Sequence, residues 1–211
     1  MMKLISAMPS PYARKVRIAL AEKGLPFELV TEVPWNEGTQ TPRYNPLEKL
    51  PVLLLDDGGS IYESHFILEY LERKHPVPPL LPDDTDALLA AKQFEVLADG
   101  VCDAVVLLFF ERRRPAACRS AAWIDRQMRK VGGGVREIAR RVGDRKWAVS
   151  DRFGLGDIAA GTVLGYLDVR LPEFKWRAAH PNLDRYAERL AERPSFRDTV
   201  PYPQTISDDV I

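Results

Sequence analysis

The spacing of apolar residues changes near residue 80, and this change divides the chain into two parts. In the first part, short apolar runs bounded by turn residues predict strands, and apolar positions repeated every three or four residues predict helices. The strands are expected at residues 3–7, 27–32, 52–55 and 60–62, and the helices at residues 11–23 and from Ser64 onward. Asp57-Gly58-Gly59 is a hairpin signal between the last two strands. The first 75 residues therefore predict the order βαβ followed by ββα.

Helical spacing alone continues in the second part. The helices are expected over almost thirty residues that end before Pro115, and at residues 121–141, 155–171 and 182–192. Gly132-Gly133-Gly134 predicts a break, because three glycines cost about 2–3 kcal/mol of helix propensity, and the tail from Pro194 should be irregular. Four prolines between residues 75 and 82 indicate a linker. We expect an α/β domain at 1–75, a linker at 76–83 and an all-helical domain at 84–211.

The start of the first helix carries the clearest chemical signal. Ser10 is a suitable N-cap, and Pro11 falls at the first helical position, where its missing N–H has no cost. This arrangement puts a hydroxyl at the positive end of the helix dipole, where an anion can bind. The alternative is that Ser10 only caps the helix.

A second signal lies at Glu63-Ser64, where the next helix is expected to begin. We expect Ser64 to be the cap and, with the N–H groups that follow it, to bind a carboxylate. Glu63 can bind an ammonium group. Together the two residues would hold the head group of an α-amino acid.

Charge and composition add few constraints. Thirty basic residues balance thirty acidic ones, so net charge does not direct the chain to nucleic acid or a membrane. Residues 112–146 are the exception, with twelve Lys/Arg and three Asp/Glu. This segment is either a solvated helix face or an electropositive rim around an anionic substrate.

Cysteine and histidine placement argues against a metal or redox centre. Cys102 and Cys118 are both in helical patterns and lack metal-ligand spacing, so we expect two buried, inert thiols in a reducing cytosol. The three histidines are far apart in different elements, which indicates no metal site. The chain begins with no signal-peptide pattern and has no stretch long enough to span a membrane. We therefore expect a cytoplasmic protein.

The βαβ-ββα order matches the thioredoxin architecture. Glutaredoxins have Cys-Pro-Tyr-Cys where this chain has Ser10-Pro11-Tyr12-Ala13, so dithiol exchange is excluded there. With Leu50-Pro51-Val52, Glu63-Ser64 and the helical second half, the chain resembles the glutathione S-transferase superfamily. It looks closest to bacterial serine-type members, which have a Ser-Pro-x-x-Arg-Lys-x-Arg segment, here residues 10–17.

The resemblance implies a role for each matching residue. Ser10 would stabilise the glutathione thiolate, and Leu50, before a cis Pro51, would offer its backbone to the cysteinyl part. The γ-glutamyl end would bind Glu63 and Ser64. More loosely, Trp35 would flank the glycyl end, and the acceptor pocket would include Tyr12, Leu107 and Phe110. Asp157 matches the family's folding motif, although Gly154 replaces the usual Ser or Thr, so half of that capping box is missing.

The resemblance further implies a glutathione transferase that acts on a small, apolar electrophile and forms a homodimer. Asp99 or Asp103 of the partner would reach the γ-glutamyl amine. Two alternatives stay open. One is a binding or regulatory protein without catalysis, and the other is a glutathione-dependent isomerase, peroxidase or thiol transferase.

Overall fold

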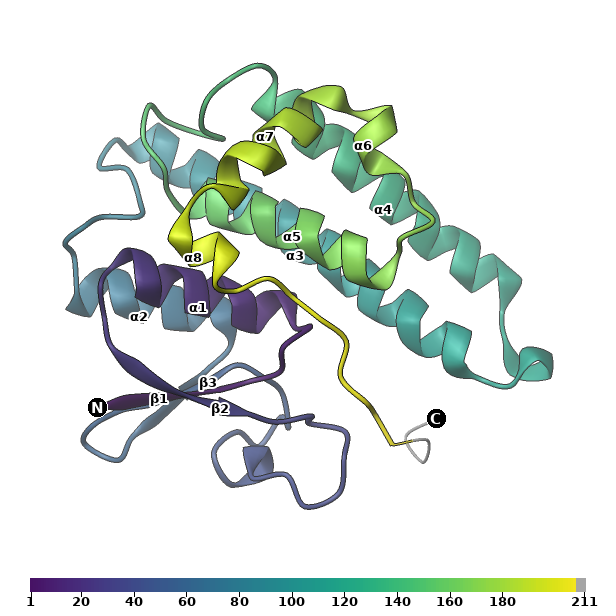
Figure 1. The fold of residues 1–211 in the computed structure, drawn as a ribbon, viewed down its shortest axis with the longest axis horizontal. Helices are drawn as coiled ribbons and strands as arrows, with labels where there is room; N and C mark the ends of the chain where they lie inside the picture. The colour runs from purple at the N-terminus through teal and green to yellow at the C-terminus, as the bar shows by residue number, and fades with distance from the viewer. Residues whose placement is uncertain (208–211) are drawn as a thin grey trace. The chain divides into compact units, whose positions relative to one another are not determined.

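The computed structural model describes residues 1–207, which form two compact units (Figure 1). Among the described residues, the first unit contains Met1–Leu80 together with residues 193–207, and the second contains Leu81–Glu192. The expected domain at 84–211 therefore differs from the structure at its C-terminal end. The reason is a set of polar contacts to the first helix, where Glu22 accepts hydrogen bonds from Arg193 Nε at 2.9 Å and from Ser195 Oγ at 2.5 Å.

A four-stranded mixed sheet forms the centre of the first unit. Its strands are β1 (Met2–Ser6), β2 (Phe27–Thr31), β3 (Val52–Leu54) and β4 (Ser60–Tyr62), in the order β2-β1-β3-β4. β1 and β2 are parallel, whereas β3 pairs antiparallel with both β1 and β4. Leu4, Ile5, Val52 and Leu53 are buried at the centre of this sheet. The four predicted strands are confirmed to within one residue at each end.

Two helices lie on one side of this sheet (Figure 1). They are α1 (Pro11–Glu22) and α2 (Ser64–Lys74), and a short 3₁₀ helix, η1 (Thr41–Arg43), interrupts the loop between β2 and β3. The last helix of the described residues, α8 (Pro194–Arg197), packs against α1. The sequence pattern did not predict α8, because four residues are too few to show a helical period.

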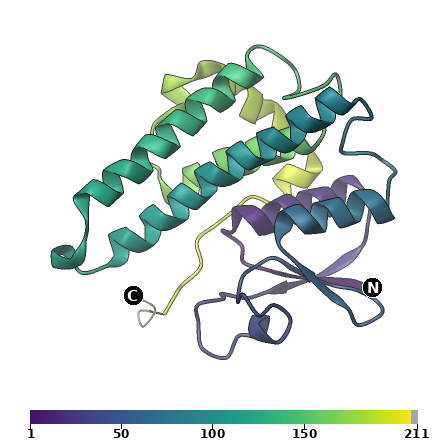
Figure 2. The same cartoon turned by 180° about the vertical axis from the view of Figure 1, so that it is seen from behind.

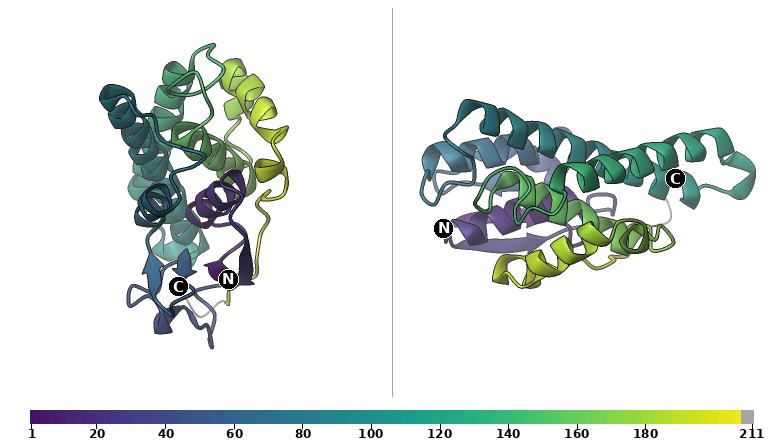
Figure 3. Two further views of the ribbon diagram at one scale, coloured as in Figure 1. Left: turned by 90° about the vertical axis from the view of Figure 1, so that its left-hand side faces the viewer. Right: turned by 90° about the horizontal axis from the view of Figure 1, so that it is seen from above.

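The second unit is helical, as predicted, and α3 packs against both α4 and α5 (Figures 2 and 3). Its elements are α3 (Thr85–Arg113), η2 (Ala116–Cys118), α4 (Ala121–Val142), α5 (Leu155–Arg170), α6 (Trp176–Ala179) and α7 (Pro181–Ala191). α5 is buried along most of its length, which explains why its sequence is apolar on all sides. Cys102 is buried in α3, but Cys118 is exposed in η2, so the prediction of two buried thiols was wrong for Cys118.

The predicted break at the three glycines was also wrong, because α4 continues through them. Gly134 explains why a glycine is useful there. A Cβ atom at this position would lie within 2.2 Å of Val101 Cγ2 on α3, so only glycine permits this close approach. Burial of Val131 and Val135 on the same face of α4 offsets the poor helix propensity.

Asp157 supports the start of α5 from within the second unit. Its carboxylate accepts hydrogen bonds from Gly154 N at 2.9 Å, Ala148 N at 2.8 Å and Tyr186 Oη at 2.5 Å. Burial raises the pKa of Asp157, and the hydrogen bonds from Tyr186, Ala148 and Gly154 oppose that shift. The half of the capping box that the chain retains thus joins the helix start to two other segments.

Candidate functional site

Ser10 lies in a tight turn between β1 and α1. Its N–H donates to Ala7 O at 3.1 Å, which closes the turn, and its Oγ accepts a hydrogen bond from Ala13 N at 3.2 Å. The predicted cap is therefore confirmed, and Pro11 occupies the first helical position as expected. Ser10 as a whole is half-buried.

Capping leaves the Ser10 hydroxyl able to act on a ligand. A serine hydroxyl has one proton to donate and two lone pairs that accept. The bond from Ala13 N uses a lone pair only. Ser10 can therefore cap α1 and donate to an anion at the same time, and the two interpretations of this residue do not exclude each other.

Strand register brings three predicted site segments to one end of the sheet. Val52 pairs with Ile5 and with Tyr62, so the start of β3 lies beside the ends of β1 and β4. The residues that continue these strands, namely the Ser10 turn, Leu50-Pro51 and Glu63-Ser64, therefore meet at this end. The Leu50–Pro51 peptide bond is cis, as the resemblance implied, with Leu50 half-buried and Pro51 buried.

The start of α2 differs from the prediction. Glu63, not Ser64, is the N-cap, and its carboxylate accepts hydrogen bonds from His65 N at 3.1 Å and Phe66 N at 3.3 Å. Ser64 is the first helical residue, is buried, and donates to Glu63 Oε1 at 3.4 Å. The reason is the backbone of Glu63, whose φ of 74° turns its side chain back over the helix start. A serine signal alone could not show this conformation.

The other predicted site residues are divided between the two units. Trp35 is 41% exposed in the loop after β2, and Tyr12 is half-buried in the first turn of α1. Leu107, which is 41% exposed, and the half-buried Phe110 belong to α3 in the second unit. Their joint role as an acceptor pocket stays a prediction.

Sequence reasoning missed the C-terminal segment as a neighbour of the site. Gln204 Oε1 accepts a hydrogen bond from Met8 N, within the turn that carries Ser10, at 2.6 Å. Two buried arginines of α1, Arg14 and Arg17, donate to carbonyl oxygens of Phe196 and Asp198. The sequence did contain a signal for this contact, namely the arginines within the largely apolar pattern of α1. Buried guanidinium groups need hydrogen-bond acceptors, and another segment of the chain has to supply them.

Comparison with known proteins identifies the family. The family model described as glutathione S-transferase, N-terminal domain, matches residues 9–74, and the corresponding C-terminal domain matches residues 121–189. The chain is also 70% identical to a glutathione S-transferase from Methylobacterium radiotolerans, solved in complex with glutathione sulfonate. That match covers 100% of this chain and 99% of the other, with a TM-score of 0.98. The chain belongs to the glutathione S-transferase family.

Two further proteins that are similar to this chain are informative. A glutathione S-transferase from Methylobacillus flagellatus with GSH bound is 43% identical, covers 95% of this chain and 100% of its own, and has a TM-score of 0.92. Maleylacetoacetate isomerase from Pseudomonas aeruginosa is 31% identical over 96% of this chain and 97% of its own. Proteins similar to this chain therefore differ in their named activity.

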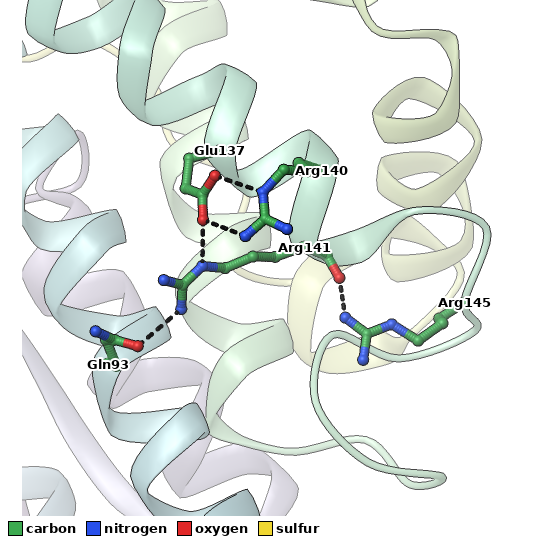
Figure 4. Close-up of polar contacts among 5 residues, drawn as sticks. All are labelled: Gln93, Glu137, Arg140, Arg141 and Arg145. Atoms are coloured by element: carbon green, nitrogen blue, oxygen red, sulfur yellow. Dashed lines mark hydrogen bonds and ion pairs between the residues drawn. The ribbon is translucent and has the colours of Figure 1, made fainter.

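Ion pairs neutralise part of the basic segment at 112–146 of this glutathione S-transferase family member. Arg112 pairs with Glu173, and Glu137 accepts hydrogen bonds from both Arg140 and Arg141 (Figure 4). Those hydrogen bonds, from Arg140 and then Arg141, lower the pKa of Glu137 to about 2. These contacts favour the solvated helix face over the electropositive rim.

Residues 1–207 contain no cluster of three or more His, Cys, Asp or Glu side chains that could hold a metal ion. Over the same residues, no helix has the length and apolar character needed to cross a bilayer.

Proposed function

We propose that this protein is a glutathione transferase in which Ser10 stabilises the thiolate of bound glutathione for attack on a small, apolar electrophile. One observation carries the proposal: Ser10 Oγ accepts the bond from Ala13 N with a lone pair and keeps its proton for the sulfur. A hydroxyl that already accepts a hydrogen bond is also a better donor. The α1 N-terminus adds a favourable dipole.

The energy required matches what this arrangement can supply. A free thiol has a pKa of about 8.5, so only a few per cent is ionised at neutral pH. Lowering that pKa by about two units requires roughly 2.7 kcal/mol of preferential thiolate stabilisation. A charge-assisted hydrogen bond contributes about 1.5–3 kcal/mol and the helix end about 0.3–1 kcal/mol.

The rest of glutathione would be held at the same end of the sheet. We assign the cysteinyl part to the backbone of Leu50, the γ-glutamyl end to Glu63 and Ser64, and the glycyl end to Trp35. Glu63 already accepts two backbone hydrogen bonds, but a carboxylate has about four lone-pair sites and can also accept from an ammonium group. Tyr12, Leu107 and Phe110 are assigned to the acceptor pocket.

We further propose a cytoplasmic homodimer, in which Asp99 or Asp103 of one protomer reaches the γ-glutamyl amine in its partner. Leu89, Val96 and Asp103 are exposed and recur every seven residues, on one face of α3. The first two are large apolar side chains, 59% and 65% exposed, as expected of a face that binds a second protomer. A 23.9 kDa species in sedimentation at micromolar concentration would contradict the dimer.

A glutathione-dependent isomerase is the second candidate, favoured by the 31% identity with maleylacetoacetate isomerase. This reaction would use the same thiolate, because the thiol adds to the substrate and then leaves. A peroxidase would use the same thiolate to attack the peroxide O–O bond, which gives an alcohol or water and the sulfenic acid of glutathione. A second glutathione would then displace water from that sulfur to form the disulfide. Thiol transfer is less consistent with the site, because Ser10 cannot form a mixed disulfide. A binding protein without catalysis would require none of the Ser10 chemistry.

The experiment is a panel of aryl halides, α,β-unsaturated carbonyl compounds, maleyl-type cis-alkenes and peroxides, each assayed with and without glutathione. Calorimetry measures glutathione affinity in parallel, and the ultraviolet thiolate absorbance of the complex gives the pKa of the bound thiol. We expect binding, a thiol pKa below about 8.5, and turnover of at least one class. Binding with an unshifted thiol pKa and no turnover would support a binding protein instead.

A further inference from the structure

The C-terminal segment of the first unit passes beside the turn that carries Ser10. Residues 198–207, called here the C-terminal strap, follow α8 and run along the unit as the yellow extended chain of Figure 1. Gln204 lies in this strap, 196 positions from Met8, and its Oε1 accepts a hydrogen bond from Met8 N at 2.6 Å. The strap thus contacts the turn directly.

Met8 is where the turn needs an external partner. The turn closes internally through Ser10 N and Ala7 O, and the neighbouring Ser6 O accepts from Glu32 N at 2.9 Å. Met8 is only 7% exposed, so its N–H requires an acceptor from the protein. The side chain of Gln204 supplies that acceptor.

A second contact joins the strap to the same residue. Arg17 donates through one terminal nitrogen to Met8 Sδ, at 3.8 Å, and through the other to Asp198 O, at 3.4 Å. Further along, Asn36 donates to Thr205 O at 3.3 Å and accepts from Ser207 N at 2.8 Å. The strap is therefore anchored on both sides of Gln204, so that its amide is held in place opposite Met8.

We propose that Gln204 is a positioning residue for catalysis, which acts by fixing the turn at Met8 so that the Ser10 hydroxyl is held toward the sulfur of glutathione. This inference rests on the proposed function. In this proposal the thiolate site needs the strap in addition to the N-terminal sheet and α1. In this proposal the strap acts on the thiolate site through the turn at Met8.

The test compares two near-isosteric variants in the full chain. Gln204→Met removes the acceptor, whereas Gln204→Glu retains a carboxylate oxygen that can accept from Met8 N. Thr205→Val is the matched control, because Thr205 is exposed and its hydrogen bond to Asn36 uses the backbone oxygen. Thiolate absorbance, kcat and KM for glutathione are measured from pH 5.5 to 9.

Gln204→Met should lower kcat at pH 6.5 by about 2- to 13-fold, the range of one hydrogen bond, and raise the pKa of the bound thiol. The deficit in kcat should disappear above the free thiol's pKa, while KM for glutathione at pH 6 changes less than twofold. Gln204→Glu should recover at least part of the lost kcat, and Thr205→Val should resemble the parent.

Three results would overturn the inference: a parental pH profile in Gln204→Met, a loss of equal size at every pH, or a loss of equal size in Thr205→Val. Failure of the proposed function is separate, because the parent protein would then show no lowered thiol pKa.

Discussion

Replacement of Ser10 tests the proposed mechanism most directly, because this side chain makes two separable contributions. Ser10→Ala removes both the cap to Ala13 N and the proton for the thiolate. Loss of the cap should reduce the free energy of unfolding by about 0.5–2 kcal/mol. Loss of the donor to a charged sulfur should cost about 1.5–3 kcal/mol, which corresponds to a roughly 10- to 150-fold drop in thiolate at neutral pH.

Two further substitutions separate these effects. Ser10→Asp retains an N-cap acceptor of equal quality, but its carboxylate cannot donate and repels a thiolate. It should therefore unfold at the parental denaturant midpoint and be less active than Ser10→Ala. Ser10→Thr keeps both the acceptor and the proton, so it should retain most of the activity and the stability.

The assay is a pH–rate profile with any active substrate, combined with urea unfolding of each variant. The Ser10→Ala defect should shrink as pH rises toward the free thiol's pKa of about 8.5, since solvent base then ionises the thiol. At pH 6, where the bound thiol is mostly protonated, glutathione affinity should change little, because Leu50, Glu63 and Ser64 are expected to provide most of it. Parental turnover of Ser10→Ala at pH 6.5 would show that Ser10 is only a helix cap.

Three other substitutions test single contacts. Ser64→Ala should weaken glutathione binding by about 10- to 150-fold in calorimetry with little loss of stability, because Glu63 provides the cap; unchanged affinity would refute the assigned γ-glutamyl site. Glu22→Gln removes a carboxylate whose pKa in the parent protein is lowered. Burial raises the pKa of Glu22, but the hydrogen bonds from Arg193 and Ser195 lower it by more. Its stability deficit in urea should therefore be full at pH 7 and diminish below about pH 4.5, and a pH-independent deficit would contradict this assignment. Tyr186→Phe should lose about 1.5–3 kcal/mol of stability at pH 7, and less as falling pH protonates Asp157, whose pKa burial raises; altered turnover would show a wider role.

Local sequence determined most of the secondary structure and the Ser10 cap. The four strands are short apolar runs with turn residues between them, and the long helices repeat apolar residues at helical spacing. The cap at Ser10 depends on residues within one helical turn, namely Pro11 and the N–H of Ala13, so a local pattern could predict it. The resemblance then supplied the cis bond before Pro51, which a local pattern does not show.

Only the tertiary structure decided the features that depend on distant partners. The glycines of α4 remain helical because α3 packs against them, with Val101 close to Gly134. Gln204 meets Met8 across 196 positions, and no pattern within either segment requires that contact. The period of apolar residues indicates which side of a helix or strand is buried. It does not report which distant residue covers that side, because the free energy of such a contact depends on the packing of the whole unit.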